Sequence, residues 1–146
     1  METKEFKISI NAPKEKVWDV LWNDSSYRAW TSVFAEGSHA ETDWKKGSKV
    51  LFLDNKGRGM VSVIAEKIPN EFMSFKHLGE VKDGVEDTSS ERVSQWAGAL
   101  ENYSLNTVNG KTELTVDMNI TDEFRDYFLN TWPRALDKVK ELAEKN

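Results

Sequence analysis

Cysteine is absent from the 146-residue chain, which excludes disulfides, a thiol nucleophile and a thiolate metal site. The two histidines, His39 and His77, lie far apart and do not match zinc-ligand spacing. The acidic residues between 80 and 91 lack the Asp-x-Asp-x-Asp-Gly order of a calcium loop. Gly57-Arg58-Gly59 lacks the flanking strand and helix of a phosphate loop. We therefore expect neither a metal nor a cofactor.

Long apolar runs are also missing. No run approaches the ~20 residues that span a bilayer, and the N-terminal residues contain no apolar signal core. We therefore expect a cytoplasmic protein with no membrane insertion.

Clustered positive charge is missing as well. The net charge is −5, and the densest basic groups are pairs such as Lys45-Lys46. Phosphate binding requires clustered Lys and Arg, so the charge pattern argues against a nucleic-acid partner.

No internal repeat and no linker rich in proline, glycine or serine divides the sequence. A chain of this length fits one domain, and we place a single domain over residues 1–146. Aromatic residues are plentiful, with six Trp, seven Phe and three Tyr. This exceeds what a small core usually needs, and large rings can line a cavity as well as fill a core.

The hydrophobic periodicity predicts an α+β fold. Alternation over residues 4–10 predicts a strand, Asn11-Ala12-Pro13 opens a helix that ends near Trp22, and residues 25–30 form a second short helix. Six strands are predicted next, over residues 38–44, 48–54, 59–67, 71–79, 97–108 and 111–120. Residues 80–96 are polar and are predicted to form a long loop, with one helical turn near 89–95.

The last predicted element is a long helix over residues 122–145, with Thr121 as its N-cap. Its apolar face comprises Phe124, Phe128, Trp132, Leu136, Val139 and either Leu142 or Ala143. Pro133 lies inside the helix and removes one backbone hydrogen bond, so a kink is expected there.

This order of elements resembles the helix-grip fold of the START-like, or SRPBCC, superfamily, which includes the birch-pollen-allergen and polyketide-cyclase branches. The resemblance rests on residues 10–21 (INAPKEKVWDVL), on residues 132–142 (WPRALDKVKEL), on Tyr27 and Trp30, and on Trp96-Ala97-Gly98. Within the superfamily the chain is most similar to bacterial single-domain proteins akin to the activator of the ninety-kilodalton heat-shock ATPase. The resemblance implies a curved antiparallel sheet of about seven strands, gripping the long helix around a lipophilic pocket.

The Asn109-Gly110 dipeptide fixes a strand register, because both residues accept the positive φ of a two-residue hairpin turn. Val108 then faces Lys111, and Glu101 faces Met118. The apolar face that contains Met118 must point at the long helix, so Glu101 and Tyr103 point inward too. A carboxylate there is either near the rim, reaching solvent or a basic side chain, or a polar anchor for a ligand.

His77 shares a strand face with Met73 and Phe75, so it points inward, where it can meet Glu101 or Tyr103. It is either a structural histidine held by hydrogen bonds or part of a binding site. His39 lies at a strand start and is expected to be exposed. The candidate cavity-lining residues are Trp30, Phe52, Phe75, His77, Glu101, Tyr103, Met118, Phe124, Phe128 and Trp132.

Three functions remain open. The first is the binding or carriage of a small hydrophobic molecule between the long helix and the sheet. The second is a cyclase- or hydrolase-type enzyme using Glu101, His77 and Tyr103, which requires these side chains to converge. The third, implied only by the resemblance, is regulation of a chaperone ATPase through a protein partner. No catalytic motif is present, which favours the first.

Overall fold

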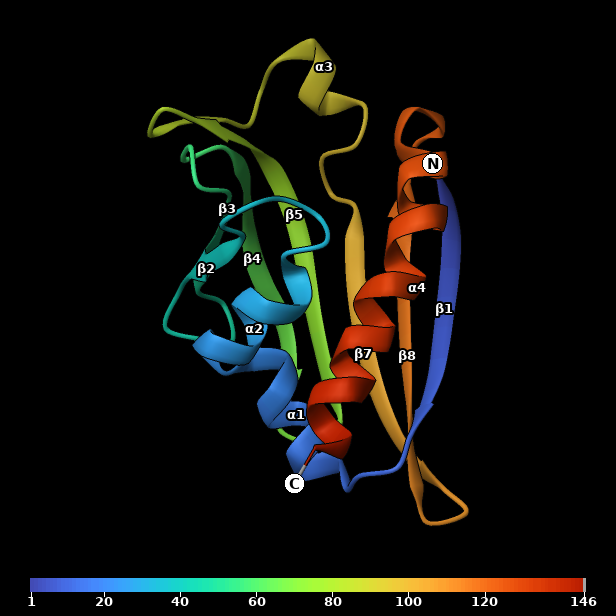
Figure 1. The fold of residues 1–146 in the computed structure, drawn as a ribbon. Helices are drawn as coiled ribbons and strands as arrows, with labels where there is room; N and C mark the ends of the chain where they lie inside the picture. The colour runs from blue at the N-terminus through green and yellow to red at the C-terminus, as the bar shows by residue number, and fades with distance from the viewer. Residues whose placement is uncertain (146) are drawn as a thin grey trace.

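The computed structural model describes residues 1–145 and shows a curved antiparallel sheet with helices on one face (Figure 1). The elements in chain order are β1 (Glu2–Ile10), α1 (Lys14–Trp22), α2 (Asp24–Thr31), β2 (His39–Glu41), β3 (Lys49–Leu53), β4 (Gly59–Ile68), β5 (Phe72–Lys82), β6 (Val85–Asp87), α3 (Glu91–Ser94), β7 (Leu100–Val108), β8 (Lys111–Ile120) and α4 (Asp122–Glu144). The predicted α+β helix-grip architecture is confirmed.

The strand order is β1-β8-β7-β5-β4-β3-β2, and β6 pairs with β5 at one end of the sheet. In Figure 1, α1, α2 and α4 all lie on the same side of the sheet, and α4 runs across β7 and β8. We call this side the concave face. Alternate residues of a β-strand point to opposite faces of the sheet, so about half of the strand side chains point at the helices, with irregularities in the β4–β5 pairing.

The Asn109-Gly110 turn has the backbone that its sequence predicts, with φ values of 52° and 78°. The register follows as expected, because Val108 pairs with Lys111 and Glu101 pairs with Met118.

The predicted loop over residues 80–96 is wrong in part. Strand β5 continues to Lys82, turns at Asp83-Gly84 and returns as β6, with Lys82 paired to Val85. Asp83 and Gly84 both have positive φ, so Asp-Gly forms the same kind of hairpin turn as Asn109-Gly110 and could have predicted it. The flanking residues are too polar to show a strand pattern. The expected helical turn is present as α3.

Helix α4 has two unlike halves. The half from Thr131 to Glu144 buries its apolar stripe against the core through Thr131, Trp132, Ala135, Leu136, Val139 and Ala143. The half from Asp122 to Asn130 has no fully buried side chain, and Phe124 is 42% exposed. Thr121 is the N-cap residue, as predicted, and its side chain makes no capping hydrogen bond. Pro133 lies in the second half and provides no amide hydrogen for the carbonyl of Leu129.

A pair of substitutions in α4 tests this division. Trp132→Ala should lower the free energy of unfolding by about 3–5 kcal/mol, because it leaves a large void in a packed region. Phe124→Ala should change it by about 0.5 kcal/mol or less, since the ring is already partly in water. Urea denaturation followed by circular dichroism measures both. Equal losses would contradict the two-halves description.

Candidate functional site

Four polar side chains form a continuous hydrogen-bonded row on the concave face, which we call the polar row. Ser62 Oγ lies 2.6 Å from His77 Nδ1, and His77 Nε2 lies 3.1 Å from Glu101 Oε1. Tyr103 donates its phenolic hydrogen to Glu101 Oε2. Ser62 comes from β4, His77 from β5, and Glu101 and Tyr103 from β7. The row therefore connects three neighbouring strands.

An irregularity in the β4–β5 pairing positions the inner end of the row. Val61 pairs with Gly79, but the next residue, Ser62, pairs with His77. This shift places the Ser62 hydroxyl against the His77 imidazole. Such bulges redirect side chains and are common beside functional sites.

The hydrogen-bond donors follow from the chemistry of Glu101. An ionised carboxylate can only accept, so Glu101 accepts one hydrogen bond from Tyr103 and one from His77 Nε2. In a neutral imidazole His77 Nδ1 is then unprotonated and accepts the hydroxyl hydrogen of Ser62. The hydrogen bonds of the row thus converge on the carboxylate, from His77 on one side and from Tyr103 on the other.

Aromatic rings surround the outer end of the row. The ring of Tyr103 contacts Trp22, Phe75, Trp132 and Trp30, at centroid separations of 4.8, 6.0, 6.1 and 6.4 Å. All four pairs meet edge to face, an arrangement that aromatic quadrupoles favour. The carboxylate of Glu101 is therefore anchored in an otherwise aromatic surface.

Two buried phenols remain proton donors. Burial raises the pKa of Tyr103, and the nearby Glu101 carboxylate raises it further. Burial also raises the pKa of Tyr27, again with a contribution from Glu101. Both hydroxyls stay protonated near neutral pH and can donate hydrogen bonds, but neither can act as a base there.

Two indole N–H groups in the same region lack partners. The Nε1 atoms of Trp22 and Trp132 are buried, and neither has a hydrogen-bond partner within residues 1–145. Trp22 and Trp132 are 8% and 3% exposed, and both rings contact Tyr103. A buried donor without a partner is unusual because leaving it unpaired costs about 1–3 kcal/mol. An acceptor atom of another molecule can reach them only if neighbouring side chains move.

The row reaches solvent only at Glu101. The Glu101 side chain is 21% exposed, whereas that of His77 is 8% exposed and Ser62 is fully buried. Among residues 1–145 Glu101 makes no ion pair with Lys or Arg. The cost of partly burying its carboxylate is therefore offset by the hydrogen bonds from His77 and Tyr103. The prediction that Glu101 and His77 point inward and meet is confirmed.

The row can be considered as catalytic machinery. His77, Glu101 and Tyr103 converge as an enzyme would require, and Ser62, His77 and Glu101 follow the serine–histidine–acid order of hydrolases. However, Ser62 has no exposed surface from which it could attack a substrate. Nucleophilic attack by Ser62 therefore does not fit this arrangement.

The predicted cavity-lining residues fall into three classes. Trp30, Phe75, Tyr103, Met118 and Trp132 are buried together with His77 on the concave face. Phe52, Phe128 and Glu101 are half-buried. Phe124 is exposed, which corrects its placement on the cavity floor.

Aromatic side chains pack closely on the concave face, and the expected enclosed cavity is not among the hollows found within residues 1–145. Two of these hollows are open to solvent, one beside Phe6 and Pro133 and the other beside Glu2 and Thr121. Neither is lined by the polar row. The physical reason is that the aromatic rings pack against one another and occupy the space.

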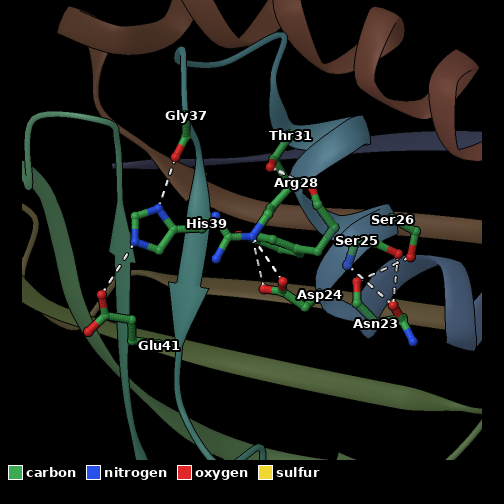
Figure 2. A network of polar contacts seen from close by, with 10 residues as sticks. Asn23, Asp24, Ser25, Ser26, Arg28, Thr31, Gly37, His39 and Glu41 are labelled. Carbon is green, nitrogen blue, oxygen red and sulfur yellow. Dashed lines mark hydrogen bonds and ion pairs between the residues drawn. The ribbon is translucent and has the colours of Figure 1, made fainter.

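His39 lies outside this site, at the start of β2 (Figure 2). Its Nδ1 lies 2.9 Å from the carbonyl oxygen of Gly37, and its Nε2 lies 3.3 Å from Glu41. Its side chain is only 19% exposed, so the expectation of an exposed histidine is wrong. These local bonds hold it against its own strand.

Sequence reasoning missed three residues of the site: Ser62, Tyr27 and Trp22. Tyr27 and Trp22 lie on inner faces of short helices, and their helical spacing could have identified them as buried. The position of Ser62 depends on the strand irregularity, for which the sequence gives no signal.

No helix within residues 1–145 has both the length and the apolar character needed to cross a bilayer. No group of three or more potential metal-ligating side chains is found within those residues either.

Solved structures with this fold include three that align over nearly the whole chain. The Aha1 dimer from Colwellia psychrerythraea, determined in solution, is 21% identical with a TM-score of 0.75, covering 99% of this chain and 97% of that one. Protein CV1439 from Chromobacterium violaceum is 16% identical with a TM-score of 0.70, covering both chains fully. DynU16, encoded in the dynemicin biosynthetic locus, is 14% identical with a TM-score of 0.74, covering 99% of this chain and 48% of that one.

A comparison with curated protein sequences gives no match. The family model described as activator of Hsp90 ATPase homolog 1-like protein matches residues 11–144, which include α1, the polar row and the whole of α4. The chain therefore belongs to the family of activator of Hsp90 ATPase homolog 1-like proteins.

Proposed function

We propose that this domain binds one small, largely aromatic or apolar molecule on the concave face, with Glu101 as its polar anchor. The observation that carries the proposal is a partly exposed carboxylate bonded to Tyr103, whose ring contacts two tryptophans with unpartnered indole N–H groups. A ligand hydroxyl can donate to Glu101, while a ligand oxygen can accept from Trp22 or Trp132. Apolar sites with a few fixed polar groups are typical of small-molecule binding.

Entry of such a molecule requires movement, because side chains fill the concave face. The half of α4 from Asp122 to Asn130 is the element best suited to move, since it has no fully buried side chain. Two contacts tether it: Tyr127 donates to the carbonyl of Phe34 at 2.7 Å, and Arg125 lies 2.8 Å from Glu2. Both tethers are near the surface, where such contacts stabilise weakly.

A second candidate is regulation of a chaperone ATPase by direct contact. It is supported by the family match and by the exposed rings of Phe124 and Tyr127 on α4, which could meet a protein partner. Stimulation of the cognate chaperone ATPase by the wild-type chain, and its loss in a Phe124→Ala/Tyr127→Ala variant, would support this role. Absence of stimulation would remove it.

Hydrogen exchange tests the movement of α4. Backbone amides of residues 126–130 should exchange at least about tenfold faster than those of residues 135–143, because the first half opens without unfolding the core. Mass spectrometry of peptic fragments measures both segments in one sample. Equal protection of the two segments would contradict entry beneath the first half of α4.

Two matched probes test the anchor. 2-Naphthol carries a hydroxyl donor, whereas 2-methoxynaphthalene has the same ring system and can only accept. The wild-type protein should bind 2-naphthol more tightly, because its hydroxyl can donate to the Glu101 carboxylate. Glu101→Gln preserves the shape of the side chain and removes its charge. It should weaken 2-naphthol binding by about tenfold or more and leave 2-methoxynaphthalene nearly unchanged.

Isothermal titration calorimetry measures the four affinities, and Lys56→Glu on an exposed turn serves as a control for altered charge. An equal loss for both probes would assign Glu101 a purely structural role. Failure of the wild-type protein to bind either probe would overturn the proposed function.

A further inference from the structure

The two edges of the sheet differ greatly in length. One edge is the three-residue strand β2, and the other is the nine-residue strand β1, which pairs on one side only, with β8. The outer side of an edge strand presents backbone N–H and C=O groups that can pair with another strand. Strand β1 is therefore the principal open edge of the molecule (Figure 1).

Helix α4 covers only one end of this edge. The carbonyl oxygen of Ser9 accepts a hydrogen bond from Lys140 Nζ at 2.9 Å, and the N–H of Asn11 donates to Glu144 Oε2 at 2.8 Å. In an antiparallel strand, alternate residues direct both backbone groups to the same side. Thr3, Glu5 and Lys7 therefore also point outward, where no other group of residues 1–145 bonds to them.

We propose that β1 pairs with β1 of a second copy of this chain, antiparallel and about a two-fold axis that passes through Phe6. Glu5 of each copy then faces Lys7 of the other, and the two Phe6 residues face each other. The sheets of the two copies become continuous, and the outward backbone groups of Glu5 and Lys7 are satisfied.

The charges on β1 select this register. Paired residues must lie on the same face of the sheet, so the axis must pass through a residue. An axis at Glu5 would oppose Glu5 to itself, and an axis at Lys7 would oppose Lys7 to itself, both of which are destabilising. An axis at Phe6 gives two attractive pairs. In the single chain Glu5 and Lys7 pair with each other at 3.5 Å, and both are about half exposed, so they can exchange partners.

The surface beside β1 also favours a second copy of this chain as the partner. One of the open hollows lies between β1 and α4, and its apolar lining is Phe6, Ile8, Pro133 and Leu136. A second copy paired along β1 would cover it. One short strand pair and this hollow make a contact smaller than the roughly 800 Å² per partner of a typical stable interface. The dimer should therefore be weak and depend on concentration.

Sedimentation equilibrium tests the proposal over a roughly hundredfold range of protein concentration. The wild-type chain should show a monomer–dimer equilibrium. Lys7→Glu and Glu5→Lys should each weaken dimerisation by about tenfold or more, because each replaces two attractive pairs by two repulsive ones. An equimolar mixture of the two variants should associate again, and so should the double variant Glu5→Lys/Lys7→Glu.

Lys56→Glu changes the net charge as Lys7→Glu does and should leave the dimer unchanged. A monomeric wild-type chain at every concentration would overturn the proposal. A dimer whose affinity is the same in wild type, Lys7→Glu and Glu5→Lys would overturn it as well.

The absence of cysteine permits a direct test of register. A mixture of Glu5→Cys and Lys7→Cys chains should form a disulfide between the two variants under mild oxidation, because these positions face each other. Either variant alone should stay largely uncrosslinked. A disulfide formed mainly by Glu5→Cys alone, or by Lys7→Cys alone, would contradict an axis at Phe6.

Discussion

A single carboxylate on an aromatic face constrains much of this structure. Removing the charge of Glu101 from water is costly, and its partial exposure lowers that cost only in part. The rest of this cost is offset by hydrogen bonds from His77 and Tyr103, since no Lys or Arg within residues 1–145 pairs with Glu101. The other ring nitrogen of His77, Nδ1, also needs a hydrogen-bond partner, and the hydroxyl of Ser62 is that partner. The strand irregularity at Ser62 can be understood as the backbone adjustment that completes this row.

The polar row also explains why the aromatic surface does not resemble an ordinary core. A core of the same rings without Glu101 would bury no charge and would leave the phenol of Tyr103 without its acceptor. Two indole N–H groups in this region remain unpaired, although a small adjustment of sequence could have removed them. A surface that keeps such groups despite their cost is suited to a guest that can satisfy them.

Much of the site was predictable because it depends on local rules. The Asn109-Gly110 turn fixes the pairing of β7 with β8, and the alternation of β5 fixes the direction of His77. These two rules bring Glu101 and His77 to the same face. The contribution of Ser62 was not predictable, because it depends on a register shift between two strands that have no distinctive turn at that point.

The filling of the concave face was equally beyond sequence reasoning. Counting aromatic residues shows that rings are available, but whether they enclose space or fill it depends on their rotamers and on the position of α4. Phe124 illustrates this limit, because helical spacing assigned it to the inner face while the structure leaves it exposed. The half of α4 that contains it touches the core only through partly buried side chains such as Phe128, whereas the half from Thr131 onward buries its apolar residues.

The two histidines of the chain allow the central claim to be measured directly. Ring nitrogen resonances can be recorded by NMR while 2-naphthol is added, with His77 inside the polar row and His39 as an internal reference beside Glu41. The His77 signals should shift to saturation, because the bound molecule bonds to Glu101, while those of His39 should stay constant. Saturable binding that leaves His77 unchanged would contradict the claim that Glu101 and its partners anchor the bound molecule.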